Sequence, residues 1–189
     1  GNGTIENLIA HETAHQWFGN AVTESDWHHV WLSEGFATYF THLYNEGTYG
    51  ATARQKAMAV DREKILQHPL LTERPVVDTT LMDINQVLSI ITYQKASFVL
   101  HMLRREIGDD AFWSGIRNYY AAYQNKNALT ADFRKYMEVS SGKDLGWFFN
   151  QWIFSPGAPE LNVTWKFNKK SGMLDVRVRQ TGSQIFTFN

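Results

Sequence analysis

Two histidines four residues apart carry the strongest chemical signal in this chain. They lie in the segment His11-Glu12-Thr13-Ala14-His15, within a stretch of helical apolar spacing that predicts a helix over residues 5–18. A four-residue step in a helix places both imidazoles on one face, one turn apart, so they can share one metal ion. A catalytic zinc site uses three protein ligands and leaves the fourth position to water. The segment therefore predicts a metal site with a third ligand from elsewhere in the chain.

Glu34 is the leading candidate for that third ligand. It follows His15 by nineteen residues and lies early in a second predicted helix, over residues 31–47. A reversal of the chain between the two helices could bring its carboxylate over the histidine pair. Glu12, next to His11, points to one side of the pair, where it could reach the water in the fourth position. That is the place of a general base.

The motif and its spacing resemble a known family of peptidases. The segments His-Glu-Thr-Ala-His-Gln-Trp-Phe-Gly-Asn (11–20) and Trp-Leu-Ser-Glu-Gly-Phe-Ala (31–37) look like those of zinc aminopeptidases of the aminopeptidase N (gluzincin) family. The family pattern, H-E-x-x-H, eighteen residues and then E, is met without adjustment. This resemblance implies one Zn²⁺ held by His11, His15 and Glu34, with Glu12 as catalytic base and peptides as substrates. It also implies a mainly α fold, the helical zinc-binding lobe of a thermolysin-like catalytic domain.

A second segment extends the resemblance. Ile-Thr-Tyr-Gln-Lys-Ala (91–96) is similar to the family's Tyr-x-Lys-Gly or Tyr-x-Lys-Ala segment, whose tyrosine donates a hydrogen bond to the developing oxyanion. The resemblance therefore implies a catalytic role for Tyr93. Without it, Tyr93 would be one of eight tyrosines and would be interpreted as a packed aromatic side chain.

Two departures from the family pattern leave alternatives open. Family members carry a Gly-x-Met-Glu-Asn segment upstream of the zinc helix, which binds the amino terminus of the substrate, and the sequence from Gly1 onward does not include it. In addition, Ser33 stands where asparagine commonly precedes the third ligand, so the surroundings of Glu34 could differ. A thermolysin-like endopeptidase and a non-catalytic interaction module on a zinc scaffold therefore remain alternatives to an aminopeptidase.

The remaining sequence predicts the elements that position these residues. Thr4 is a candidate cap of the first helix. Helical spacing and cap residues predict five further helices. These span residues 51–66, 88–107, 109–123, 130–139 and 144–152. The long connection over 68–85 is a candidate wall of a binding cleft.

The apolar period changes from helical to two after the Pro156-Gly157-Ala158-Pro159 segment. Alternating apolar residues on either side of a Lys170-Ser171-Gly172 turn predict a hairpin. Two or three strands alone are marginal in water. We therefore expect residues 1–157 to be a catalytic domain that lacks its amino-terminal part, residues 158–189 to open a β-sandwich domain, and the chain to be a piece of a longer protein.

Composition excludes several other classes of protein. The chain has 18 Lys and Arg against 19 Asp and Glu, so no global field favours nucleic acid, and no apolar run is long enough to cross a bilayer. There is no cysteine, so any metal must be held by His, Asp or Glu. Localisation and oligomeric state stay open.

The other histidines and the tryptophans near the motif receive structural interpretations. The histidines at positions 28, 29, 42, 68 and 101 lack a partner at helical spacing and are expected to face solvent or to serve structure. The aromatic residues that flank the motif are expected to form core around the zinc helices: Trp17, Phe18, Trp27 and Trp31.

Overall fold

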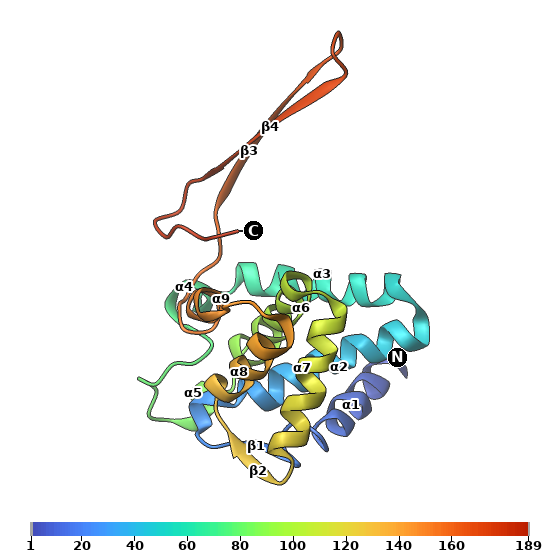
Figure 1. Cartoon of the computed structure of the whole chain (residues 1–189), viewed down its shortest axis with the longest axis vertical. Helices are drawn as coiled ribbons and strands as arrows, with labels where there is room; N and C mark the ends of the chain where they lie inside the picture. Colours follow the sequence, from blue (N-terminus) through green and yellow to red (C-terminus); the bar gives the residue numbers. More distant parts are fainter. Residues whose placement is uncertain (1, 189) are drawn as a thin grey trace. The chain divides into compact units, whose positions relative to one another are not determined.

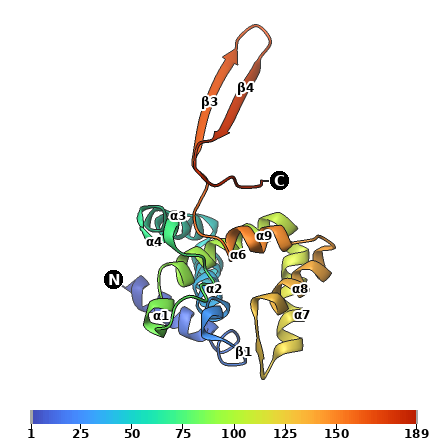
Figure 2. The same ribbon diagram turned by 90° about the vertical axis from the view of Figure 1, so that its left-hand side faces the viewer.

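The computed structural model describes the backbone of residues 2–188 and the side chains of residues 5–188. Thr4, the expected cap of the first helix, lies outside the described side chains. The described chain is mainly helical, as the sequence predicts (Figures 1 and 2). Its helices are α1 (Asn2–Ala14), η1 (Trp27–His29), α2 (Trp31–Tyr49), α3 (Ala51–Gln67), α4 (Leu70–Glu73), α5 (Ile84–Val87), η2 (Ile91–Lys95), α6 (Ala96–Ile107), α7 (Asp109–Tyr123), α8 (Thr130–Ser141) and α9 (Gly146–Trp152). Its strands are β1 (Val22–Glu24), β2 (Lys126–Ala128), β3 (Leu161–Asn168) and β4 (Met173–Gln180).

The chain divides into two compact units, with the boundary between Pro156 and Gly157. The first contains all of the helices together with β1 and β2, and the second contains the hairpin of β3 and β4. The division falls at the segment where the apolar period changes in the sequence.

An aromatic core holds the helical unit together. Phe36 of α2 lies at the centre, with its ring stacked 4.4 Å from Phe18 and edge-on to Phe133 at 5.2 Å. Trp31 opens α2, is fully buried, and donates its indole hydrogen to Thr130 over 2.8 Å. These contacts fix the first turn of α2, which carries Glu34.

The expected continuous helix over 88–107 is wrong at its start. Residues Ile91–Lys95 form one wide π-type turn before α6 begins at Ala96. The Thr92 hydroxyl donates to the Val87 carbonyl over 2.9 Å and accepts from the Ser89 amide over 3.0 Å, so a side chain shapes the turn. Such turns inside helices are frequent at functional sites, and this one carries Tyr93.

Two short strands join distant parts of the helical unit. β1 and β2 pair in parallel, with Val22 opposite Lys126 and Glu24 opposite Ala128. Neither strand is predicted by the sequence, because three-residue strands have too little alternation to be recognised. The pairing anchors the segment between α1 and α2.

Two of the four aromatic residues near the motif are not core residues. Phe18 and Trp31 are 3% and 0% exposed, whereas Trp17 is 49% and Trp27 60% exposed. Burial of these two tryptophans was therefore a wrong expectation. The stripe of Ile5, Leu8 and Ile9 that marked the first helix is also more than half exposed, so its spacing identifies the helix without identifying what covers it.

The second unit is an antiparallel hairpin, as the sequence predicts. Apolar pairs lie on one face, including Val163 opposite Val178 and Trp165 opposite Val176. Each of these side chains is more than half exposed, which leaves the apolar face of the hairpin without a packing partner among the described residues.

Among the described helices, none combines the length and the apolar character that a membrane span requires.

Candidate metal centre

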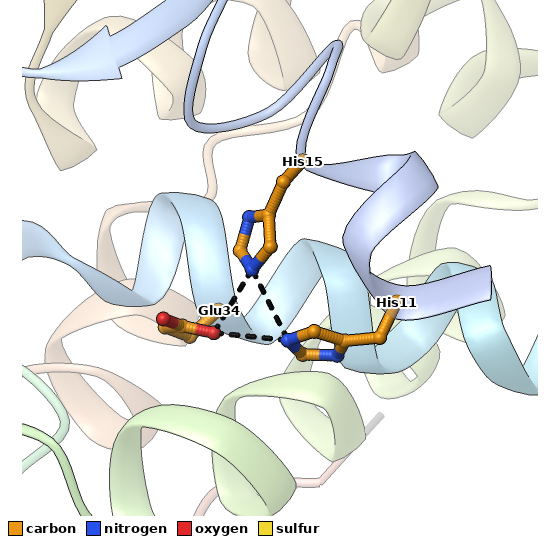
Figure 3. A group of neighbouring side chains, drawn as sticks. All are labelled: His11, His15 and Glu34. Carbon is orange, nitrogen blue, oxygen red and sulfur yellow. Dashed lines mark hydrogen bonds and ion pairs between the residues drawn. The ribbon is translucent and has the colours of Figure 1, made fainter. Parts of the chain in front are cut away.

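Three side chains from two helices converge on one point, as Figure 3 shows. The Nε2 atoms of His11 and His15 lie 3.1 and 3.2 Å from Oε2 of Glu34. The two imidazole Nε2 atoms lie 3.1 Å from each other. Three ligand atoms of the kinds that bind zinc thus form a nearly equilateral triangle.

The local fold explains this convergence. His15 directly follows Ala14, the last residue of α1, and its amide still donates to the His11 carbonyl over 3.2 Å, so the four-residue step places both imidazoles on one face. Helix α2 packs along α1, and its first turn carries Glu34. Nδ1 of His15 lies 3.0 Å from the carbonyl oxygen of Phe18, to which it can donate a hydrogen bond. With that hydrogen bond in place, Nε2 of a neutral His15 presents a lone pair, as a metal ligand must.

The dimensions of the triangle fit a zinc ion. Zinc bonds of about 2.0–2.1 Å in a tetrahedron separate neighbouring ligand atoms by about 3.3 Å. The observed separations of 3.1–3.2 Å lie close to this value. Two imidazoles and one carboxylate are also a common ligand set of catalytic zinc.

Electrostatics keep the third ligand ionised. Burial alone would raise the pKa of Glu34, but the neighbouring polar groups of His11, His15 and Tyr93 lower it to about 2. The hydrogen bond to Glu34 in turn raises the pKa of His15, against the effect of burial. The Glu34 carboxylate is therefore ionised over the whole neutral range and favours a cation.

Tyr93 lies beside the triangle. Its ring stacks on His11 with the ring centroids 6.1 Å apart, and its hydroxyl is close enough to the Glu34 carboxylate to help lower the pKa of that group. Burial, and then the charge of Glu34, raise the pKa of the Tyr93 phenol. The phenol therefore keeps its proton at neutral pH and can donate it in a hydrogen bond.

Glu12 lines the same cleft and is solvent-exposed. Its negative charge is close enough to raise the pKa of both His15 and Tyr93. The structure thus brings His11, His15, Glu34 and Tyr93 into contact and leaves the Glu12 carboxylate at the edge of the group, open to the cleft.

The cleft has a volume of about 1230 Å³ and extends well beyond the triangle. Sequence reasoning missed several residues that line it. The hydroxyl of Ser33 donates to the carboxylate of Glu24, so the residue before the third ligand is held by β1. His42, which lies further along α2 and was expected to face solvent or serve structure, pairs with Asp61 of α3. Residues distant in sequence supply these contacts, so no local motif marks them.

The other histidines take structural partners. Nε2 of His28 lies 2.9 Å from the carbonyl oxygen of Leu81, and Nδ1 of His29 lies 2.7 Å from the hydroxyl of Thr130. These contacts attach the loop between α1 and α2 to distant segments.

Comparison with known proteins adds independent observations. Residues 2–152 match a family described as the peptidase family M1 domain. The chain is 34% identical over 167 residues to aminopeptidase N of Lactococcus lactis, covering 82% of this chain and 19% of the relative. It is 34% identical over 179 residues to human glutamyl aminopeptidase, covering 92% of this chain and 19% of the relative. The chain thus spans about a fifth of the length of these relatives.

Solved structures resemble it as well. An M1 zinc metallopeptidase mutant of Deinococcus radiodurans bound to the substrate Tyr-Ser-Ala matches 82% of this chain and 34% of its own, with a TM-score of 0.71 and 28% identity. Aminopeptidase A of Legionella pneumophila, in complex with aspartic acid, matches 93% of this chain and 19% of its own, with a TM-score of 0.75. At 24% identity, the second likeness is one of fold alone.

Proposed function

The chain belongs to peptidase family M1, and from this premise we propose that it is the zinc-binding part of an aminopeptidase that hydrolyses the first peptide bond of its substrates. The observation that carries the proposal is the triangle of His11, His15 and Glu34 with Tyr93 beside it. We further propose that one zinc ion per chain is held by these three ligands. Aminopeptidase relatives of similar sequence support the exopeptidase assignment.

The roles of the residues follow from their chemistry. When bound, zinc supplies Lewis-acid chemistry, which lowers the pKa of water to about 7 and polarises the carbonyl group. The Glu12 carboxylate takes a proton from the attacking water as the water oxygen bonds to the carbonyl carbon of the peptide. Glu12 then passes this proton to the amine nitrogen as the carbon–nitrogen bond breaks. The Tyr93 hydroxyl donates a hydrogen bond to the carbonyl oxygen as it becomes negative.

The domain assignment is also a proposal. We propose that residues 1–157 form part of the catalytic domain and that residues 158–189 begin a β-sandwich. The one-sided apolar hairpin supports the second assignment, because further strands would cover its exposed face.

Substitution of Glu12 tests the proposed function. In the full-length protein, Glu12→Gln keeps the shape of the side chain but removes its basic oxygen. We expect zinc content near one ion per chain and a loss of aminoacyl-nitroanilide hydrolysis of about 10²-fold or more. His15→Ala is the matched variant, expected to lose the metal together with the activity.

Substantial turnover by Glu12→Gln with zinc in place would contradict the role of this residue. Comparison of free and N-acetylated peptides separates the two hydrolytic alternatives, since an aminopeptidase requires a free amino terminus and an endopeptidase does not.

A further inference from the structure

One face of α2 carries a row of buried polar side chains that leads away from Glu34. Thr38, Thr41, His42 and Asn45 follow Glu34 at offsets of four, seven, eight and eleven residues, so they lie on the same face of the helix. All four are 7–9% exposed and all line the cleft of the metal centre. The inward face of a helix is ordinarily apolar. A polar row at this position therefore calls for a polar occupant.

The length of this row suggests the size of the occupant. Eleven residues of helix from Glu34 to Asn45 span about 16 Å at 1.5 Å per residue. An extended peptide advances about 3.3–3.6 Å per residue. The row is therefore long enough for four or five residues of an extended peptide.

The hydrogen bonds of the row determine what kind of group it can bind. The Thr38 hydroxyl donates to the Glu34 carbonyl over 2.7 Å, and the Thr41 hydroxyl donates to the Ala37 carbonyl over 2.9 Å. Each hydroxyl has one hydrogen, so what remains on both oxygens is the capacity to accept. The two threonines of the row thus present acceptors to the cleft, whereas Nδ2 of Asn45 donates to Oδ1 of Asn7 over 3.0 Å.

His42 adds a further acceptor. Its Nε2 lies 3.0 Å from Oδ2 of the buried Asp61 carboxylate, to which it donates in the neutral tautomer. Nδ1 is then an acceptor, and it has no hydrogen-bond partner among the described residues. Buried polar atoms are nearly always paired, so this atom indicates a donor that the described chain does not supply.

We propose that this row binds the backbone N–H groups of the peptide on the carboxyl side of the scissile bond. The inference rests on the proposed function: an aminopeptidase holds a single residue on the amino side, so a site several residues long can take only the leaving peptide. The preferred substrates are then peptides of about five residues. Asp61 is a positioning residue that fixes the tautomer of His42.

The dependence of hydrolysis on peptide length tests the proposal. The full-length enzyme is given peptides of two to six residues with the same first residue, and kcat/KM is compared. We expect kcat/KM to rise about tenfold or more from the dipeptide to the pentapeptide and then to level off, since each net hydrogen bond contributes about 0.5–1.5 kcal/mol. The ratio of pentapeptide to dipeptide does not depend on how much of the enzyme is folded.

Matched variants of one threonine identify the acceptor. Thr41→Val removes the oxygen and is expected to lower the pentapeptide-to-dipeptide ratio about three- to tenfold through KM, whereas Thr41→Ser keeps the acceptor and the ratio. Thr72→Val is the control, because the Thr72 hydroxyl also donates to a backbone carbonyl but does not line the cleft. A flat length profile in the wild-type enzyme, or an unchanged ratio in Thr41→Val, would overturn the proposal.

A binding measurement separates this proposal from the proposed function. Calorimetry with Glu12→Gln measures the affinity for the same dipeptide and pentapeptide without turnover, and we expect the pentapeptide to bind about tenfold more tightly. If the pentapeptide binds more tightly but the wild-type enzyme hydrolyses no peptide, the proposed aminopeptidase function is contradicted, whereas peptide binding by the row is not. Equal affinities for the dipeptide and the pentapeptide would contradict peptide binding by the row, whether or not peptides are hydrolysed.

Discussion

The two histidines of the candidate metal centre are oriented by contacts that leave their Nε2 atoms free for a metal. His15 is oriented by the Phe18 carbonyl, and the ring of His11 stacks on Tyr93. A set of ligands held in this way changes its geometry little when a cation enters, so less ordering entropy has to be overcome on binding. The same contacts place the Tyr93 hydroxyl next to the ligand set.

Removal of the Tyr93 hydroxyl tests the proposed role of this residue as a hydrogen-bond donor to the carbonyl oxygen. Tyr93→Phe keeps the ring that stacks on His11 and deletes only the hydrogen-bond donor. We expect kcat of the full-length enzyme to fall about 10²–10³-fold, the range typical for loss of one oxyanion donor. Zinc content and KM should change little, and a kcat within about twofold of wild type would argue against this role.

At the scale of elements, a close approach of helices sets the distance between Glu34 and Tyr93. A Cβ atom at Gly35 would lie 2.7 Å from Cβ of Ala96, the first residue of α6. Only glycine permits this spacing, and it brings the first turn of α2 against the π-type turn Ile91–Lys95. The third ligand and the tyrosine are thus joined through backbone packing.

An added methyl group at this contact should separate the two elements. We expect Gly35→Ala to lower the free energy of unfolding by about 1–3 kcal/mol, as overpacking does, and to lower kcat because Tyr93 moves relative to Glu34. Gly47→Ala on the same helix is the control: no atom lies within 4 Å of its added Cβ, and the helix propensity of alanine should raise stability by up to about 1 kcal/mol. Equal stability of the two variants in chemical denaturation would count against the close contact.

At the scale of the whole molecule, the helical unit buries one amine at a cost in stability. Lys95 is 5% exposed, and its Nζ has no hydrogen-bond partner among the described residues. Burial lowers the pKa of Lys95 to about 8 from its ordinary 10.5. The charged form is disfavoured because nothing compensates for its lost hydration.

This burial makes stability depend on pH in a defined direction. Between about pH 8 and 10.5 the unfolded chain binds more protons at Lys95 than the folded chain, so the free energy of unfolding rises with pH across this window. Below about pH 8 the cost is present in full, on the order of 3 kcal/mol. Lys95→Met should therefore stabilise the protein at neutral pH, and its advantage over the wild type should shrink as the pH approaches 10.

Paired denaturation curves of both proteins at each pH isolate the contribution of Lys95, since the other titrating groups are common to them. An advantage of Lys95→Met that stays constant between pH 7 and 10 would show that burial does not shift this amine.

The metal motif and most helices could be predicted because they depend on short-range geometry. A four-residue step is a full turn wherever a helix forms, so the placement of His11 and His15 on one face follows from sequence. The helix over residues 31–47 was recognisable by its apolar period, and the start of the hairpin by a change in that period. The position of Glu34 early in the second helix already made it the leading candidate for a third ligand, whereas only the resemblance to the family singled out Tyr93.

The chain by itself thus determined the helical fold and the family and indicated the candidate ligands, because these depend on neighbouring residues. Only the tertiary structure decided how large the cleft is and that Thr38, Thr41 and His42 line it. It also decided that Tyr93 lies in a π-type turn and that Trp17 and Trp27 stay exposed. A period of 3.6 residues shows that a helix has faces, but what packs on each face is set by segments far away in the chain.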